Sequence, residues 1–213
     1  MSQVRVHNFA ISLDGFGTGD GLTLEAPFGH AGERLHGWYV ATQFFHTMRS
    51  ETGGGEGVDN AFAERHSSNI GAEIMGRGKF GPQTGPWEDL EWEGWWGAEP
   101  PFHTPVFVLT HHVRPSITLS DTTFHFVDAD PAEALRQAKA AAGGRDVRLG
   151  GGVSTVRAFL DADLVDTLHI AVAPIDLGRG ERLWNDADEL LDRYHRDTVP
   201  SGSGVTHLIV WRR

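Results

Sequence analysis

Three consecutive glycines stand where a strand is expected to pass into a helix. The stretch DVRLGGGVSTVRAFL, residues 146–160, runs from apolar residues through Gly150, Gly151 and Gly152 into a helical pattern that begins near Val153. A helix that begins there leaves the N–H groups of its first turn without partners. These donors and the helix dipole together favour the binding of an anion. Glycine would let a phosphate reach this backbone, because it carries no side chain to block the approach. We expect a phosphate-binding turn; the alternative is a tight turn that binds nothing.

The residues around these glycines do not form a standard nucleotide motif. Ser154 and Thr155 add hydroxyl donors to the predicted turn. The G-x-G-x-x-G fingerprint of dinucleotide-binding folds also needs an acidic residue near the end of the next strand, and GGGVST matches that pattern poorly. A phosphate loop ends in G-K-[ST], whereas the Gly-Lys step at 78–79 is followed by Phe80. Neither motif therefore accounts for the turn.

Two further strand ends carry glycine or polar residues. Arg77 lies between Gly76 and Gly78, directly after a short apolar strand, and its planar guanidinium suits a phosphate. Thr110 and His111 follow the strand VFVL. Ligands of open α/β sheets bind outside the carboxyl ends of the strands, so we expect one ligand to use all three strand ends. Taken alone, Arg77 is better explained as an ordinary surface arginine beside a turn.

The elements that must position these residues alternate between strands and helices. The pattern predicts an α/β fold, a three-layer α/β/α sandwich with a mostly parallel central sheet and a C-terminal antiparallel hairpin. Residues 33–48 have the spacing of one amphipathic helix, and residues 131–142 form the clearest helix, with Asp130 as its cap and Gly143 at its end. Strands are expected in these stretches: QVRVHNFAISL, AEIMG, PVFVLTH, FHFVD, DVRLGG, VDTLHIAVAPI, and the two halves of the hairpin around PSGSG.

Composition narrows the classes of function. The chain has 213 residues and a formal net charge of −11, which disfavours a nucleic-acid partner because no basic run offsets it. It has no cysteine, and its histidines lack the H-E-x-x-H spacing, so we expect no metal site. The apolar runs are too short to span a membrane, and the N-terminus has no apolar core of signal-peptide length. We therefore expect a cytoplasmic protein that uses no membrane.

Four stretches together resemble a known family. ISLDGF, IMGRGKFGP, VFVLTHH and VRLGGGVSTVRAFL, in this order and spacing, are similar to the dihydrofolate reductase-like superfamily. More narrowly, the chain resembles stand-alone bacterial proteins with the RibD C-terminal domain. The resemblance covers nearly the whole chain and implies a single domain over residues 1–213, NADPH as the hydride donor, and a homodimer.

The resemblance also implies roles for particular residues. It assigns the cofactor pyrophosphate to the turn and the 2′-phosphate to the neighbourhood of Arg77. It places a cation at Lys79, where the family often has threonine, and the nicotinamide beside the S-L-D-G turn. The implied cofactor-binding residues are Ala10, Ile11, Gly15, Gly76, Arg77, Gly78, Lys79, Thr110, His111, Gly150, Gly151, Gly152, Val153, Ser154 and Thr155.

The substrate side is less well defined. The helix that holds the substrate carboxylate in dihydrofolate reductases has no Asp or Glu here from Leu35 to Phe45, so we do not expect efficient folate reduction. Trp38, Thr42 and Gln43 are candidates to line the substrate pocket, and for Trp38 core packing is at least an equal alternative. Asp14 is the candidate catalytic residue: in an apolar cleft its pKa would rise and it could donate a proton. Asp-Gly is also simply a turn dipeptide.

Three functions stay open at this point. The first is an NADPH-dependent reductase of a small heterocyclic or carbonyl substrate. The second is a reductase of 5-amino-6-(5-phosphoribosylamino)uracil in riboflavin biosynthesis, whose substrate phosphate would need a second basic pocket that the sequence does not show. The third is a protein that binds NADPH as a sensor without turnover. The tryptophan-rich stretch at 87–96 could form a lid, a dimer contact or a self-packed loop.

Overall fold

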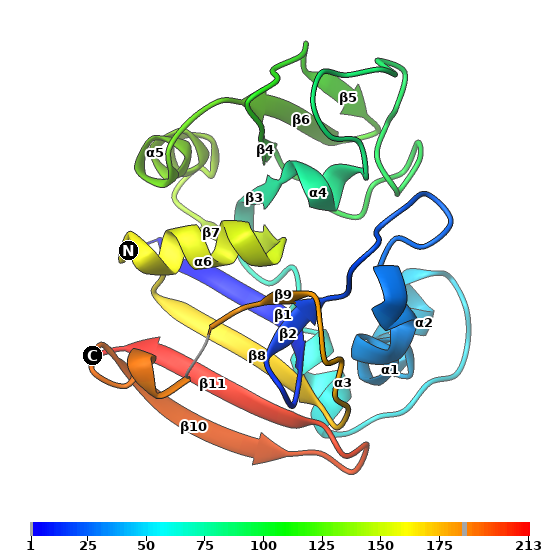
Figure 1. Cartoon of the computed structure of the whole chain (residues 1–213), viewed down its shortest axis with the longest axis vertical. Helices are drawn as coiled ribbons and strands as arrows, with labels where there is room; N and C mark the ends of the chain where they lie inside the picture. Colours follow the sequence, from blue (N-terminus) through cyan, green and yellow to red (C-terminus); the bar gives the residue numbers. More distant parts are fainter. Residues whose placement is uncertain (1, 185–186) are drawn as a thin grey trace. The chain divides into compact units, whose positions relative to one another are not determined.

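Two groups of elements make up the chain in the computed structural model, which describes residues 2–184 and 187–213. The first unit contains the residues up to Arg5 together with Asn69–Asp166. The second contains Val6–Ser68 and Thr167–Arg213. Figure 1 labels the elements of both units, and each unit is described by itself.

The first unit is built on a mostly parallel sheet. Its strands follow the order β7-β3-β4-β6-β5, in which β7, β3, β4 and β6 are parallel neighbours and β5 is antiparallel to β6. The short edge strand β5 was not expected from the sequence. The strands of this unit are β3 (Ile70–Gly76), β4 (Val106–Leu109), β5 (Ile117–Leu119), β6 (Thr122–Val127) and β7 (Asp146–Gly151).

Helices α4 (Arg77–Phe80), α5 (Pro131–Ala141) and α6 (Val153–Asp161) cover this sheet. Figure 1 shows α5 and α6 on one side of the strands and α4 on the other. The α5 helix begins as the sequence predicts, because the Asp130 carboxylate accepts the Glu133 N–H at 2.8 Å and Pro131 occupies the first turn. Helix α4 follows β3 directly, so Arg77 begins a short helix where the strand ends.

The tryptophan-rich stretch packs on the α4 side of this sheet. Trp87, Trp92 and Trp96 lie against a buried cluster that includes Phe80 and Phe124. The Trp92 indole N–H donates to the Phe80 carbonyl at 3.1 Å. These contacts pack the stretch against the core of the first unit, and a role as a lid or a dimer contact stays a prediction.

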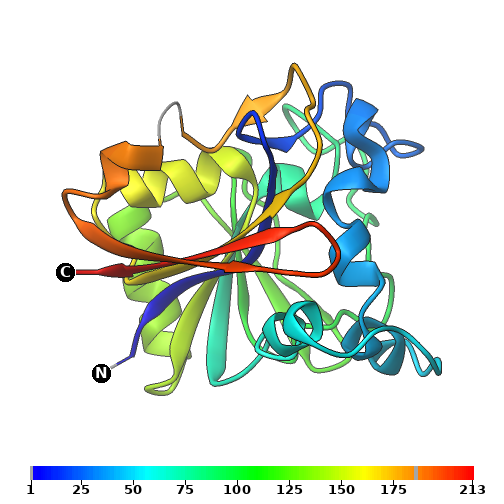
Figure 2. The same ribbon diagram turned by 90° about the horizontal axis from the view of Figure 1, so that it is seen from below.

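The second unit contains an antiparallel hairpin and two neighbouring strands. Strand β11 pairs antiparallel with both β10 and β8, and β1 lies next to β8. The C-terminal hairpin is confirmed, and Figure 2 shows it in red and orange. A small separate pair joins β2 to β9. The strands are β1 (Val4–Ser12, from Val6 onward in this unit), β2 (Phe16–Thr18), β8 (Thr167–Ala173), β9 (Glu181–Arg182), β10 (Tyr194–Pro200) and β11 (Thr206–Arg212).

The single helix expected over residues 33–48 is wrong. The structure has three short pieces instead, because Thr42 adopts an extended conformation between two of them. The chain at Gly55 pairs there: its N–H donates to the Ala41 carbonyl at 2.7 Å, and its carbonyl accepts the Gln43 N–H at 2.9 Å. The helices of this unit are η1 (Gly29–Leu35), α1 (Gly37–Val40), α2 (Gln43–Met48), α3 (Val58–Ala63) and η2 (Ala187–Leu190).

Candidate functional site

The glycine turn joins β7 to α6 in the first unit. Gly152 occupies the N-cap position and offers no side chain to cap the helix, and the Val156 N–H makes an intrahelical bond to its carbonyl at 3.1 Å. The N–H groups of Val153, Ser154 and Thr155 therefore have no partner within the helix. The Gly151–Gly152 peptide bond is cis. A methyl group placed on Gly152 would meet nothing within 4 Å, so this backbone is open to approach.

Gly76 and Thr155 bring the end of β3 against the start of α6. The Thr155 side chain is buried, and a side chain at Gly76 would overlap with its hydroxyl oxygen. The glycine is therefore required by close packing. Ser154 is exposed at the same turn. Of the predicted cofactor residues, the structure thus brings Gly76, Gly152 and Thr155 to one place.

A buried ion cluster lies next to the turn. The Glu73 carboxylate on β3 has no exposed side-chain surface; one of its oxygens accepts from Arg148 and the other accepts from Lys79 at 3.1 Å. Burial acts to raise the pKa of Glu73, but the charges of Arg148 and Lys79 outweigh it and hold the pKa below its ordinary value. Glu73 is therefore ionised, and Lys79, which we predicted to meet phosphate, is tied to it.

Gly150 sits directly on this cluster. A methyl group added to Gly150 would overlap with the Glu73 carboxylate and lie 2.6 Å from the Lys79 Nζ atom. The first of the three glycines is therefore explained by its contact with a charged pair. Gly151 is buried as well, so Gly152 is the one of the three whose backbone is shown to be open to a ligand.

Arg77 is held by an aromatic ring. Its guanidinium carbon lies 3.8 Å from the centre of the Trp87 ring, and its Nη1 donates to the Gly85 carbonyl. Its Nε and Nη2 atoms are buried and have no hydrogen-bond partner among the described residues. Burial lowers the pKa of Arg77, and the neighbouring charge of Arg114, which lies 4.9 Å from the same Trp87 ring, lowers it further. Two cations with unused donors suit an anion.

The end of β4 carries Thr110 and His111. The Thr110 hydroxyl is buried and accepts the His112 N–H at 3.1 Å. His111 points into solvent and pairs with Asp128 at 2.9 Å. Gly78 is exposed, with nothing within 4 Å of a methyl group placed on it. None of these observations tests a role in cofactor binding, which stays a prediction for all three residues.

Asp14 lies in the second unit and makes three hydrogen bonds. It accepts from the Ser12 hydroxyl at 2.5 Å, from the Leu177 N–H at 3.1 Å and from the Gly178 N–H at 2.7 Å. Burial acts to raise the pKa of Asp14, but these hydrogen bonds lower it below the ordinary value. Our expectation of a raised pKa is therefore wrong in direction. An ionised carboxylate that joins two loops is not poised to donate a proton.

The predicted substrate residues have structural partners in the second unit. Trp38 is buried in a core cluster, as its alternative interpretation holds. The Thr42 hydroxyl caps α2 by accepting the Phe45 N–H at 3.2 Å. Gln43 is exposed and donates to Glu56 at 3.2 Å. Ala10 and Ile11 are buried on β1, and Gly15 has a positive φ of 87° in the turn after it.

Comparison with known proteins shows which family the chain belongs to. The family model for the RibD C-terminal domain matches residues 5–193. The chain belongs to the RibD C-terminal domain family. The dihydrofolate reductase-like superfamily and the fold class expected from the sequence are thereby confirmed: mostly parallel strands with helices, and an antiparallel C-terminal hairpin.

Solved structures similar to this RibD C-terminal domain protein share its fold. A putative riboflavin biosynthesis protein from Shewanella sp. PV-4 has a TM-score of 0.61 and 20% identity, over 100% of this chain and 99% of that one. A pyrimidine reductase-like protein from Corynebacterium diphtheriae has a TM-score of 0.54 and 14% identity, over 100% and 92%. The RibD protein of Acinetobacter baumannii gives 0.52 and 16%, and this chain spans 58% of it.

A curated relative matches a shorter part of the chain. The uncharacterized protein YyaP of Bacillus subtilis (strain 168) is 30% identical over 66 residues. The match covers 31% of this chain and 35% of that protein, so it spans about a third of the relative's length.

Sequence reasoning missed four residues of the site in this family member. Glu73 and Arg148 each interrupt an otherwise apolar strand, and this was the available signal, because a charge in a buried strand needs a partner. Trp87 and Arg114 gave no comparable signal. They come from irregular segments, and only the folded chain shows that both contact the neighbourhood of Arg77.

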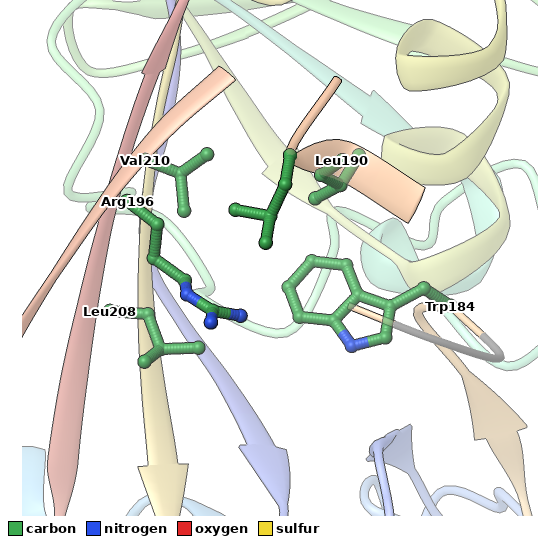
Figure 3. A pocket seen from close by; sticks show the side chains of 6 residues that line it. Trp184, Leu190, Arg196, Leu208 and Val210 are labelled. Atoms are coloured by element: carbon green, nitrogen blue, oxygen red, sulfur yellow. The ribbon is translucent and has the colours of Figure 1, made fainter. Parts of the chain in front are cut away.

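A separate pocket in the second unit is unrelated to the predicted residues. Figure 3 shows its labelled side chains, Trp184, Leu190, Arg196, Leu208 and Val210, and Leu191 also lines it. The lining is apolar apart from Arg196, which pairs with Asp188 at 3.1 Å. It offers no acid or base for a reaction on a substrate. Among the described residues, no helix has the length and apolar character needed to cross a membrane.

Proposed function

We propose that the protein is an NADPH-dependent reductase that transfers hydride to a small heterocyclic or carbonyl substrate. Membership of the RibD C-terminal domain family supports the reductase class. The observation that carries the cofactor is the glycine turn at the start of α6, with open backbone at Gly152 and uncapped N–H groups in the first helical turn. We expect the protein to act as a homodimer in the cytoplasm and to bind NADPH.

The residues present fit NADPH in two ways. The uncapped N–H groups of Val153, Ser154 and Thr155 suit a pyrophosphate, and the unpartnered Nε and Nη2 atoms of Arg77 suit a further phosphate. The unpaired donors of Arg77 add independent support for a bound phosphate. A buried guanidinium nitrogen without an acceptor destabilises the protein, and a bound anion would remove that cost. When bound, NADPH would supply the hydride.

The chain itself would bind, orient and shield the reactants. Trp87 fixes the plane of Arg77, and Thr155 packs on Gly76, so the binding groups are held before any ligand arrives. Asp14 stays ionised and joins two loops, so we infer that the proton for the substrate comes from water or from the substrate itself. Trp38, Thr42, Gln43, Ala10, Ile11 and Gly15 remain predicted contacts.

A second candidate is the reduction of a ribosylaminopyrimidine in riboflavin biosynthesis. The solved structures described as a riboflavin biosynthesis protein and as RibD favour it. That substrate would bring a phosphate of its own. Turnover with 5-amino-6-(5-phosphoribosylamino)uracil and not with its dephosphorylated form would support this candidate over a general carbonyl reductase.

Thermal unfolding with reduced dinucleotides tests the cofactor. At 100 times its dissociation constant, NADPH should stabilise the protein by about 2.7 kcal/mol. NADH at the same concentration should stabilise the protein less than NADPH does. Arg77→Gln should remove this difference between the two dinucleotides, whereas the exposed control Arg157→Gln should retain the difference. Equal shifts with both dinucleotides in the wild type would contradict the role of Arg77, and no shift with either would contradict the proposed cofactor.

Turnover separates a reductase from a sensor. NADPH oxidation would be followed with pterins, pyrimidines, quinones and aldehydes as acceptors. Binding without oxidation on every acceptor would favour a protein that senses NADPH, whereas oxidation with one class would name the substrate chemistry.

A further inference from the structure

Asn8 interrupts strand β1 with a left-handed backbone. Its φ is 56°, whereas the residues of a regular strand have negative φ values. Asparagine is one of the few residues besides glycine that adopt this conformation readily, and most other side chains are strained in it. Such conformations concentrate at binding and catalytic sites, where the surrounding structure must hold them in place. Asn8 is therefore a candidate for a role in binding.

A buried chain of side chains holds Asn8 in this conformation. Its N–H donates at 3.2 Å to Nδ1 of His169, a side chain on β8, and not to the carbonyl of a neighbouring strand. The other ring nitrogen of His169 lies 2.9 Å from Nδ1 of His207 on β11, and Nε2 of His207 lies 2.8 Å from a carboxylate oxygen of Asp59 on α3. We call His169, His207 and Asp59 the histidine chain. The two rings are 3% and 0% exposed, so the acceptor for the Asn8 N–H is fixed in place.

The histidine chain lies beside the part of β1 that is predicted to meet the nicotinamide. Strands β1, β8 and β11 are neighbours in the sheet, as Figure 1 shows. Ala10 follows Asn8 by two residues and packs in one core cluster with Trp38, whose ring makes an edge contact with His207 at 5.2 Å between ring centres. Ala10 and Ile11 are predicted contacts of the nicotinamide. A change of backbone conformation at Asn8 would thus move the residues at which that ring is expected.

We propose that Asn8 is a positioning residue, held by the histidine chain, that sets the course of β1 where Ala10 and Ile11 would meet the nicotinamide. This rests on the proposed function and extends it to residues that supply no contact of their own. The backbone of residue 8 carries the effect. Glycine at this position should therefore preserve it, because glycine takes a positive φ without strain, whereas alanine should not.

Two ligands that differ in the nicotinamide test this proposal. NADPH carries the ring, whereas 2′-phospho-ADP-ribose has the same phosphates and adenosine and lacks it. Asn8→Ala should weaken NADPH binding by roughly 5- to 30-fold, the factor that one strained left-handed residue represents, and leave the affinity for 2′-phospho-ADP-ribose unaltered. Asn8→Gly should bind both ligands like the wild type. The matched control is Asn69→Ala, the same change at an exposed asparagine with a φ of 60°, and it should alter neither affinity.

The outcomes separate this proposal from the proposed function. If the wild type binds neither ligand, the proposed cofactor is wrong, and the role of Asn8 falls with it. If Asn8→Ala binds NADPH as the wild type does, or loses affinity for both ligands equally, the positioning role is wrong while the cofactor stands. If Asn8→Gly loses as much NADPH affinity as Asn8→Ala, the backbone proposal is also wrong. The binding group would then be the side-chain amide, whose nitrogen is buried and has no hydrogen-bond partner among the described residues.

The far end of the histidine chain gives a second test. Asp59→Ala removes the acceptor for His207 Nε2 and should weaken NADPH, but not 2′-phospho-ADP-ribose, by a smaller factor than Asn8→Ala does. Asp59→Asn retains an oxygen acceptor and should bind both ligands like the wild type. NADPH affinity that is unchanged in Asp59→Ala would remove the chain from the proposal.

NMR of the imidazole nitrogens needs no variant that might fail to fold. In the wild type, NADPH should shift the Nδ1 resonance of His169, and 2′-phospho-ADP-ribose should not. The exposed ring of His195 is the control and should shift with neither ligand. A His169 resonance that NADPH leaves in place, in a protein that binds it, would overturn the link between the histidine chain and the nicotinamide.

Discussion

Stability should fall in mild acid because His169 is buried in its neutral form. This ring lies on β8 in the second unit and is stacked on Phe62 with ring centres 4.3 Å apart. Its Nδ1 accepts the backbone N–H of Asn8 at 3.2 Å, so its proton is on Nε2, which lies 2.9 Å from His207 Nδ1. His207 in turn donates from Nε2 to Asp59 at 2.8 Å. The Asn8 side-chain oxygen also lies 3.1 Å from Nδ1, so the neutral state of His169 follows from its burial and not from the lack of an acceptor.

The magnitude follows from the two protonation equilibria. Burial, and then the charges of His7, His207 and Arg65, lower the pKa of His169 from 6.5 to about 2. A lowered histidine pKa means that the unfolded chain binds a proton that the folded chain refuses, so stability is intact above pH 6.5 and falls below it. Between pH 7.5 and 5 this one group should cost about 2 kcal/mol, with a slope approaching about 1.4 kcal/mol per pH unit.

Urea unfolding at several pH values measures this loss. His169→Gln removes the titrating group while its side-chain amide can still donate to His207, so its stability should depend less on pH than that of the wild type by about 2 kcal/mol over this range. The matched control is His111→Gln, an exposed histidine, which should keep the wild-type slope. Parallel wild-type and His169→Gln curves would refute the neutral buried state, as would an NMR titration of His169 near pH 6.

Three further substitutions test the contacts described above. Thr42→Ala should lower the free energy of unfolding by about 1 kcal/mol through loss of the α2 cap, and Thr42→Ser should recover most of it in the same urea titration. Asp14→Asn should lower the free energy of unfolding at neutral pH. Because the pKa of Asp14 is lowered in the folded state, the stabilities of variant and wild type should converge as the pH falls below 3.8, which acid-unfolding curves would measure. Gly150→Ala should cost roughly 1–3 kcal/mol by overlap with Glu73, whereas Gly152→Ala should unfold like the wild type and bind NADPH more weakly.

Local sequence patterns predicted most of the elements that carry the first unit's site, but not helix α4, which carries Arg77 and Lys79. The apolar runs, the Asp130 cap and the glycines at the end of β7 indicate where strands end and where α5 and α6 begin, as the structure confirms. These features depend on neighbouring residues, so a single sequence is enough to find them. The broken helix at Thr42 depends instead on pairing with Gly55, thirteen positions away, which the periodicity of residues 33–48 could not reveal.

Protonation states were out of reach for a related reason. Asp14 was expected to have a raised pKa because an apolar cleft was the environment inferred for it, yet the two N–H groups that lower its pKa come from residues 163 and 164 positions later in the chain. Lys79 likewise owes its state to Glu73 and Arg148, the latter on a distant strand. The positions of chemically active groups thus follow from local pattern, whereas their charge is decided by long-range contacts. The raised pKa expected for Asp14 is therefore wrong, whereas its catalytic role and the phosphate-binding turn both stay predictions to be tested.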